Sequence, residues 1–259
     1  MNIYIIGASK GLGAGIAEAF AKLGHSLFIC SRNLENLNTL SDQLTKNYNI
    51  KCNYNFLDVT QKESIIKSYN ECVEIMGIPD IVIYNSGISK TDNFLNFQSQ
   101  IIKDIYSINV YGLIDSMEII LPSLLKSGKK TIFAATSSLA ELRGIPGNAG
   151  YSSSKIAVSH LLEAARCQLY KTNVKIITIK PGFVHTDMTS NSKFSMPLVK
   201  YPDKAGEIIA RKLLKRKSIV AFPVIIQFLS WAAKPIPSFI YDFIMKNLWK
   251  KNKMLEDYL

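Results

Sequence analysis

The chain has 259 residues, 47% of them hydrophobic and 20% charged, with a formal net charge of +11. This composition is typical of a globular protein and excludes an extended disordered chain, and the length permits one large α/β domain or two small ones. The positive charge indicates an anionic ligand or surface, or a solvated lysine-rich exterior, and we find no basic stripe interleaved with aromatic residues that would favour nucleic-acid binding.

Short apolar runs alternate with longer helical patterns along most of the chain. Strands are predicted at residues 2–7, 26–31, 51–58, 80–85, 131–137, 174–180 and 218–222. Helices are predicted at about residues 12–23 and 34–46, in a stretch ending near Met76, and from about Tyr151 to Tyr170. Such alternation indicates a parallel sheet covered on both faces. We predict a Rossmann-type, doubly wound α/β domain of about seven strands over 1–221, with an amphipathic C-terminal extension over 222–259.

The first strand runs directly into a glycine-rich turn. Gly7, Gly11 and Gly13 follow the spacing G-x-x-x-G-x-G and open the first helix. Glycine permits a tight turn and lets the backbone approach a pyrophosphate, and the helix N-terminus supplies amide donors and a positive dipole. This position between the first strand and the first helix predicts a dinucleotide site.

Two basic residues indicate which dinucleotide is bound. A site that prefers NAD usually has an acid about 20 residues after the turn, whereas this chain has Ser31 and Arg32 at the end of its second strand. Arg32 would pair with a 2′-phosphate, and Lys10, inside the glycine turn, is a second cation within reach. Each residue alone is compatible with a solvated surface base. Together they favour NADP(H) over NAD(H).

Tyr151 and Lys155 lie four residues apart in the predicted long helix and therefore share one helix face. A free tyrosine loses its proton only near pH ~10. A fixed cation beside it would lower that pKa and make the phenol a usable acid or base. The spacing alone is also compatible with an ordinary surface pair of tyrosine and lysine.

Cysteines and histidines give no pattern of a metal site or a disulfide framework. Cys30, Cys52, Cys72 and Cys167 are widely scattered, and the three histidines have no ligand spacing. We therefore expect no metal and a reducing compartment. The N-terminus has no basic leader followed by a long apolar stretch, so we expect a cytoplasmic protein, with any membrane contact peripheral and at the inner face.

The glycine turn and the Tyr151/Lys155 pair belong to a longer pattern that resembles the short-chain dehydrogenase/reductase family of single-domain NAD(P)-dependent oxidoreductases. The match runs from residue 2 to about residue 221, and Ile6 stands where the family commonly has a threonine. Tyr84 and Ser86 depart from the family's Asn-Asn-Ala-Gly, which bears on local stability more than on chemistry. The motifs, in the family's order, are GASKGLG, LDV, YNSG, INVYG, ATSSLA, YSSSK and PGFVHT.

The resemblance implies a role for each catalytic residue. Tyr151 would donate a proton to the substrate oxygen, and Ser138 would hydrogen-bond the same oxygen. Lys155 would lower the pKa of Tyr151 and hold the ribose hydroxyls of the cofactor. Asn109 would position a water that returns the proton through Lys155. Ser137 is the alternative to Ser138, which we prefer because the family places the catalytic serine second in such a pair.

The resemblance also implies the contacts with the cofactor. Asp58 and Val59 would contact the adenine ring, and Pro181, Gly182 and Thr186 would hold the nicotinamide carboxamide. The complete set of predicted cofactor-binding residues is Gly7, Ser9, Lys10, Gly11, Leu12, Gly13, Ser31, Arg32, Asp58, Val59, Asn85, Gly87, Tyr151, Lys155, Pro181, Gly182, Val184 and Thr186.

The final segment extends beyond the seventh strand. The apolar run from Ile219 to Ala233 is shorter than the ~20 residues that span a bilayer, and Pro223 interrupts it. Beyond the prolines at 235 and 237, apolar residues recur at helical spacing between basic clusters. Such a segment fits a membrane interface, and the resemblance includes members with such tails that act on lipidic substrates. The alternatives are helices that pack on the domain, close the substrate pocket or form a dimer face.

The hypothesis is an NADP-dependent carbonyl reductase or alcohol dehydrogenase that forms a homo-oligomer. Its small-molecule substrate would be a ketone or secondary alcohol, hydrophobic or lipid-linked, bound by residues 139–150 and 187–201, with His185 a solvent-facing loop residue. One alternative is a ketoreductase acting on a soluble sugar or a carrier-bound acyl substrate. The other is a non-catalytic NADPH-binding regulatory protein, whose usual sign, a missing Tyr, Lys or Ser, is absent here.

Overall fold

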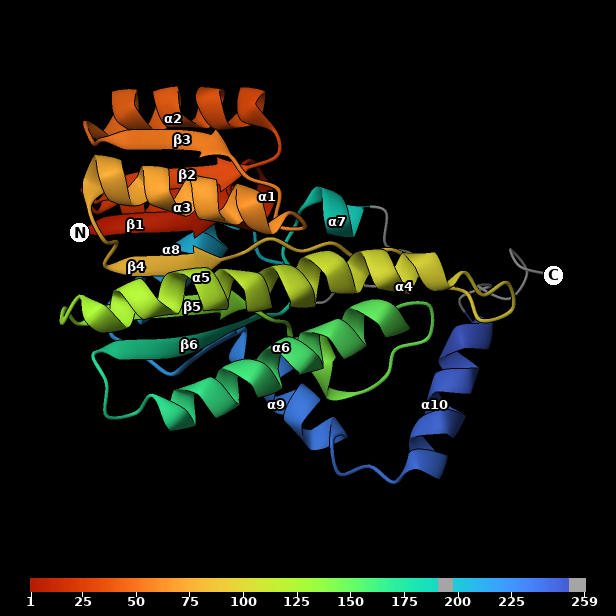
Figure 1. Cartoon of the computed structure of the whole chain (residues 1–259). Coiled ribbons are helices and arrows are strands. Elements are labelled where there is room, and N and C mark those ends of the chain that lie inside the picture. The colour runs from red at the N-terminus through yellow and green to blue at the C-terminus, as the bar shows by residue number, and fades with distance from the viewer. Residues whose placement is uncertain (191–197, 252–259) are drawn as a thin grey trace.

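Seven parallel strands form one sheet at the centre of the molecule (Figure 1). The computed structural model describes residues 1–190 and 198–251. The sheet has the strand order β3-β2-β1-β4-β5-β6-β7. The strands are β1 (Asn2–Ile6), β2 (Ser26–Ser31), β3 (Cys52–Phe56), β4 (Ile81–Tyr84), β5 (Thr131–Thr136), β6 (Val174–Pro181) and β7 (Ile219–Phe222). Each predicted strand is present, and the doubly wound fold is confirmed.

Helices cover both faces of the sheet and bury two hydrophobic clusters against it (Figure 1). One face carries α1 (Gly11–Lys22), α2 (Leu34–Tyr48) and α8 (Pro202–Leu214). The other carries α3 (Lys62–Met76), α5 (Gly112–Lys126) and α6 (Ala149–Gln168). The apolar run of β1 shows why both faces are needed: Ile3 and Ile5 belong to the first cluster, and Tyr4 and Ile6 to the second.

A long helical run that the sequence analysis did not predict lies over β4 and β5. It consists of α4 (Ser99–Tyr106), the π-helical turn η1 (Ser107–Tyr111) and α5. In the described part of the chain, this run of 28 residues is the one helix long and apolar enough to cross a bilayer. Leu113 and Ile120 are fully buried in the second cluster, as expected for a core helix of a folded domain.

The packing of α8 on α1 is close enough to fix the first helix and the glycine turn that precedes it. A Cβ atom placed on Gly206 of α8 would lie 2.0 Å from the carbonyl oxygen of Gly15 in α1, and one on Gly15 would lie 2.1 Å from the carbonyl oxygen of Pro202. The two backbones are therefore in direct contact, which no larger residue would permit. The sequence analysis did not predict α8.

The C-terminal extension folds into two helices, α9 (Val224–Ala233) and α10 (Ser238–Lys251). Helix α9 packs against β7 and against the short 3₁₀ helix η2 (Leu139–Leu142), while α10 stands away from the sheet (Figure 1). The helix expected after the prolines is thus present, and residues 252–259 lie outside the described residues. The domain boundary after residue 221 and the homo-oligomer stay predictions.

Strand order places the candidate site. β1 is flanked by β2 and β4, so the connections after β1 and β4 leave toward opposite halves of the sheet. In doubly wound sheets a crevice opens outside the carboxyl ends of the strands at this switch point, and ligands bind in it. The predicted glycine turn follows β1, and the predicted Asn85 and Gly87 follow β4.

Candidate active site

A cavity of about 800 Å³ lies at the carboxyl ends of the strands. Every predicted cofactor-binding residue lines it except Gly13. It is also lined by part of the expected substrate segment (Asp187, Met188 and Thr189), by Ser137, the alternative to Ser138, and by His185. Residues to which the sequence analysis gave no role line it too: Asn33, Asn36, Leu57, Ser86, Ile88, Ile108, Thr136 and Pro202. The volume lies within the range usual for ligand and cofactor sites.

The glycine turn after β1 depends on the absence of side chains. Gly7 has a φ of +85°, and a Cβ on it would lie 2.7 Å from the backbone nitrogen of Ser86. The amide of Gly7 donates to the carbonyl of Cys30 at 2.8 Å, which ties the turn to β2. Gly13 lies inside the turn, since a Cβ on it would be 2.0 Å from the Gly7 oxygen. Gly13 therefore lets the turn close and does not face the cavity.

The N-terminus of α1 fits an anionic group. Lys10 is the N-cap residue, and its side chain makes no capping hydrogen bond to the first-turn amides. Gly11 and Leu12 line the cavity, and the first amides of an α-helix have no intrahelical acceptor. Uncapped amide donors at the positive end of a helix are suited to a pyrophosphate. The residues present thus fit the predicted dinucleotide.

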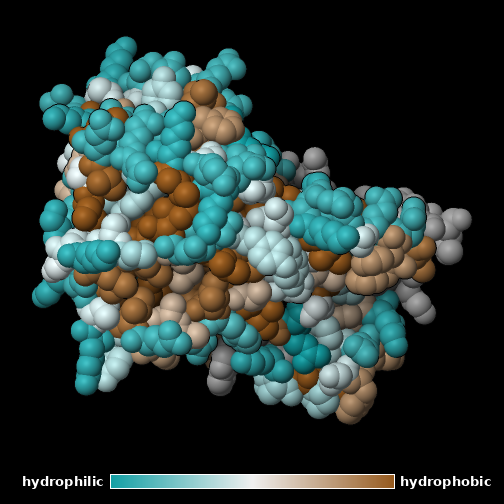
Figure 2. Space-filling model, in the orientation of Figure 1, coloured by the Kyte–Doolittle hydropathy of each residue, from teal (hydrophilic) through white to brown (hydrophobic). Residues whose placement is uncertain are grey.

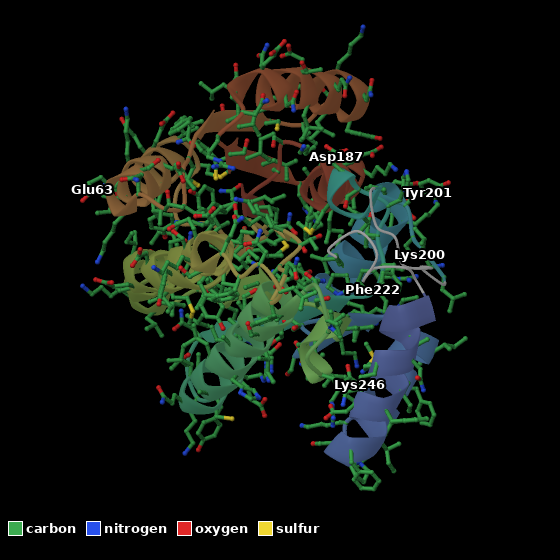
Figure 3. The ribbon with its side chains drawn as sticks, turned by 90° about the vertical axis from the view of Figure 1, so that its right-hand side faces the viewer. Glu63, Asp187, Lys200, Tyr201, Phe222 and Lys246 are labelled. Carbon is green, nitrogen blue, oxygen red and sulfur yellow. The ribbon has the colours of Figure 1, made fainter. Side chains whose placement is uncertain are left out.

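The two predicted cations differ in their surroundings. Arg32 is exposed, lines the cavity and makes no ion pair with the described residues. Lys10 pairs with Asp187 at 2.5 Å, and this hydrogen bond lowers the pKa of the Asp187 carboxyl. The side chains of Lys10 and Asp187 are 64% and 77% exposed, so the pair is weak and is easily exchanged for another anion. Figure 3 labels Asp187 in the upper part of the view, close to α1.

Two predicted cofactor residues also hold the walls of the cavity. Asn85 donates from Nδ2 to the carbonyl of Gly7 at 3.1 Å, and its Oδ1 accepts from the Thr136 hydroxyl at 3.0 Å. Asn85 therefore links the glycine turn to β5. Asp58 accepts from the amide and the hydroxyl of Thr60 at 3.0 and 2.9 Å, which fixes the loop after β3.

Two of the predicted catalytic residues, Tyr151 and Lys155, line the other end of the cavity. Ser138 does not line it, whereas Ser137, the alternative to Ser138, does. Tyr151 and Lys155 lie one turn apart near the start of α6, with the Lys155 ammonium 5.6 Å from the centre of the Tyr151 ring. Lys155 is buried and donates to the carbonyl of Thr136 at 2.8 Å. Ser138 is the N-cap of η2, where its hydroxyl accepts from the Ala140 amide at 3.1 Å, and it lies near enough to Tyr151 to affect the pKa of the phenol.

Burial is the main influence on both ionisable groups of this pair. It raises the pKa of Tyr151, and the Ser138 hydroxyl acts in the opposite direction. The net direction is opposite to that expected from a neighbouring cation alone. Burial also lowers the pKa of Lys155 to about 8, while the charge of Glu141 raises it. Each group is thus shifted toward its neutral form.

Asn109 lies in η1, is 1% exposed and does not line the cavity. Its Oδ1 accepts from the Ile88 amide at 2.8 Å, and its Nδ2 donates to the Ile88 carbonyl at 3.0 Å and to the Ser154 hydroxyl at 2.9 Å. A Cβ on Gly87 would lie 3.2 Å from Asn109 Oδ1 and 3.3 Å from Lys155 Nζ. Asn109 and Lys155 therefore flank one glycine. The water relay between them stays a prediction.

Tyr84, a departure from the family motif, has a structural role that the sequence did not show. It is buried, and its hydroxyl donates to the carbonyl of Ile108 at 2.5 Å. Because Ile108 precedes Asn109 in the π-helical turn, Tyr84 supports the backbone that carries Asn109. Burial raises the Tyr84 pKa far above its usual range. Ser86, the other departure, packs against Gly7.

The expected substrate-binding segments are only partly described. Residues 139–142 form η2, residues 187–190 form α7 (Asp187–Ser190), and residues 191–197 lie outside the described residues. His185 is exposed, as expected, and lies at the cavity with its ring 5.5 Å from that of Tyr201.

Comparisons with known proteins agree with this geometry. The family model described as short chain dehydrogenase matches residues 1–196. The chain is 29% identical over 244 residues to an uncharacterized oxidoreductase of Myxococcus xanthus, a match covering 94% of this chain and 96% of that protein.

Solved structures have the same fold. An alcohol dehydrogenase from the archaeon Thermococcus sibiricus, solved with 5-hydroxy-NADP, is similar with a TM-score of 0.77 at 25% identity, over 85% of this chain and 95% of that one. A short-chain dehydrogenase/reductase from Burkholderia phymatum, solved with NAD, also has a TM-score of 0.77, at 18% identity over 85% and 88% of the two chains. The second likeness concerns the fold alone.

The low pKa of Lys155 gives a pH dependence of stability. Between its folded value of about 8 and its ordinary value of 10.5, the unfolded chain binds more protons at this residue than the folded chain does. We therefore expect the unfolding free energy of the wild type to increase with pH across this window relative to Lys155→Met. Urea denaturation of both proteins at several pH values measures the difference.

The exposed Lys130 provides the control. Lys130→Met should differ from the wild type by the same amount at every pH. A difference between wild type and Lys155→Met that does not change across the window would contradict the assignment of a low pKa to Lys155.

Proposed function

The chain belongs to the short-chain dehydrogenase family of oxidoreductases, and on that basis we propose that it transfers a hydride between NADP(H) and a ketone or secondary alcohol of hydrophobic character. The observation that carries this proposal is the position of Tyr151 and Lys155 at one end of a cavity whose other end presents Arg32, with Ser138 beside Tyr151. Family membership supports the hydride chemistry, and the positions of the residues support their roles.

The bound nicotinamide would supply or accept the hydride. In the reducing direction negative charge grows on the carbonyl oxygen of the substrate, and Tyr151 would donate its proton there. Because burial raises the Tyr151 pKa, the phenol is fully protonated before the reaction and ready to donate. Ser138, which lies beside Tyr151, would donate to the same oxygen and orient it.

Lys155 would act after the proton has left. Its ammonium lies 5.6 Å from the centre of the Tyr151 ring, so its charge would stabilise the phenolate that forms. The same ammonium would hold the ribose hydroxyls. Asn109 is fixed by three hydrogen bonds and lies on the other side of Gly87 from Lys155. It would hold the water that returns the proton. In the oxidising direction each step is reversed.

The preference for NADP(H) rests on Arg32. It follows β2 where an NAD site usually has a carboxylate, and a carboxylate there would repel a 2′-phosphate. A guanidinium binds a phosphate through two parallel hydrogen bonds. Lys10 would contribute by exchanging its exposed bond to Asp187 for one to the phosphate.

Replacing Tyr151 by Phe should remove turnover and leave cofactor binding intact. We expect kcat for NADPH oxidation to fall by about 10²–10⁴-fold, the usual contribution of a positioned acid. The assay uses soluble and lipophilic ketones with detergent present, and NADPH binding is followed by nicotinamide fluorescence. Tyr170→Phe, at a residue 73% exposed, is the matched control. Turnover that survives in the Tyr151 variant would refute its role as the acid.

Replacing Arg32 by Ala should weaken the binding of NADPH and leave the binding of NADH almost unchanged. A charged hydrogen bond contributes about 1.5–3 kcal/mol, so the Kd for NADPH should rise about tenfold or more. The Kd for NADH, which has no 2′-phosphate, should change little and serves as the internal control. An equal loss of affinity for both cofactors would count against recognition of the phosphate by Arg32.

The apolar outer surface of the tail favours a hydrophobic substrate at a membrane. Helix α10 docks on the domain through Tyr241, whose hydroxyl donates to the Gly144 carbonyl at 2.7 Å and whose ring lies 4.1 Å beneath the Arg143 guanidinium. The opposite face of α10 is open, with Phe239 75% and Phe243 69% exposed. The helix therefore packs with one face and presents an apolar face outward.

Further apolar residues lie at the same end of the molecule. The loop before α4 exposes Phe94, Leu95 and Phe97, with the rings of Phe94 and Phe97 stacked at 5.2 Å. Figure 2 shows apolar side chains at this end, over α10 and the loop before α4. Exposed Lys234 and Lys246 flank the apolar residues of α10, and Lys246 is seen on that helix in Figure 3. This combination suits contact with an anionic lipid surface.

Membrane binding should depend on the open face of α10. We expect the full-length protein to sediment with vesicles containing phosphatidylserine at low salt, and Phe239→Ser/Phe243→Ser to lose most of that binding. Deletion of residues 223–259 should abolish it. Tyr170→Ser, an equally exposed aromatic residue elsewhere, should bind as the wild type does. An intact protein that ignores these vesicles would show that the tail has another role.

A further inference from the structure

A buried carboxylate lies behind the proposed catalytic residues and has no part in the steps described above. Glu141 is in η2, and its side chain is 6% exposed. A carboxylate at this depth is strongly disfavoured unless it is paired and hydrogen-bonded, so its partners are informative.

Both carboxylate oxygens of Glu141 have partners. Oε1 pairs with the ammonium of Lys180 at 2.5 Å, and the Lys180 side chain is itself 20% exposed. Oε2 accepts from the Ser137 hydroxyl at 2.7 Å and from the Ser159 hydroxyl. The two hydroxyls are also within 2.9 Å of each other. A charged group and three donors thus form one closed buried cluster.

These partners come from the elements that carry the active site. Ser137 follows β5 and immediately precedes Ser138. Ser159 lies one turn after Lys155 on α6, and the Ser137 hydroxyl also lies 2.7 Å from the Lys155 carbonyl. Lys180 is in β6 next to Pro181, which lines the cofactor cavity. One carboxylate therefore joins the end of β5, the catalytic turn of α6 and the end of β6.

We propose that Glu141 is a positioning residue, which holds these three elements together and keeps negative charge close to Lys155. The inference rests on the proposed function, because it concerns the placement of residues that this function uses. Glu141 is 39 residues from Lys180 in the sequence and 18 from Ser159, so the cluster exists only in the folded chain.

The effect of charge can be followed through Lys155. Burial lowers the pKa of Lys155, and Glu141 raises it. Among the described residues, the other ionisable groups that contact Lys155 or Glu141 are Tyr151, on the same helix as Lys155, and Lys180, from β6. Removing the negative charge would therefore lower the pH at which Lys155 loses its proton, and with it the pH at which the proposed stabilisation of the Tyr151 phenolate ends.

Two variants separate charge from packing. Glu141→Gln keeps the size of the side chain and removes the charge, but leaves the half-buried Lys180 without its partner. Glu141→Gln/Lys180→Met removes both charges, so a remaining effect cannot come from an unpaired ion. We expect kcat to fall about tenfold in both. The alkaline limb of kcat against pH should move to lower pH in Glu141→Gln, and by less in the double variant, which also loses the positive charge of Lys180. We expect thermal stability to recover in the double variant alone.

A Glu141→Gln variant with the wild-type alkaline limb, or a double variant with the wild-type kcat, would overturn the proposal and leave Glu141 a structural residue. The second readout needs no turnover. Lys155→Met is introduced into the wild type and into Glu141→Gln, and the pH at which each stability difference begins to rise is compared by urea denaturation. A lower onset in the Glu141→Gln background supports the proposal, and an unchanged onset overturns it. Absence of turnover in the wild type would contradict the proposed function and leave this comparison intact.

Discussion

An ammonium group buried between a sheet and a helix is stable only if it is hydrogen-bonded and faces negative charge. Lys155 meets the first condition with the Thr136 carbonyl at the end of β5, and the second with the carboxylate of Glu141 in η2. The catalytic turn of α6 is therefore tied to the strand end and to the short helix beside it. The position of Tyr151, one turn earlier on α6, follows from the same contacts. The geometry of the site is thus a consequence of where one cation can be buried.

Features encoded by local pattern could be predicted from the sequence. The strands were read from apolar runs, the turn from Gly7 and Gly11, and the helix face from the spacing of Tyr151 and Lys155. Features that join distant residues could not. Lys10 meets Asp187 across 177 residues, and Glu141 meets Lys180 across 39, with no sequence signal for either. Thr136 contributes a backbone carbonyl to Lys155, which any residue could supply, so its role left no signal at all.

The direction of the Tyr151 pKa shift shows a second limit of prediction from the sequence. The spacing of Tyr151 and Lys155 indicated a cation near a phenol, and Coulomb attraction alone lowers the pKa of such a phenol. Spacing carries no information about depth, and here desolvation raises the Tyr151 pKa and lowers that of Lys155. Desolvation therefore keeps the Tyr151 proton in place until the substrate oxygen takes it, and a Lys155 pKa of about 8 lets that ammonium release a proton near neutral pH.

The π-helical turn between α4 and α5 also fixes the spacing of the chain around the site. A π-turn closes through i→i+5 hydrogen bonds, so it holds one residue more than an α-helical turn while the helix on either side keeps its phase. Deleting one residue from Ser107–Tyr111 would therefore restore a regular α-helix and leave Ile105 facing the interior. What would be lost is the widened turn that carries Asn109 beside Gly87, and with it the three hydrogen bonds of the Asn109 amide. A one-residue deletion here would thus spare the fold and remove a group of the site.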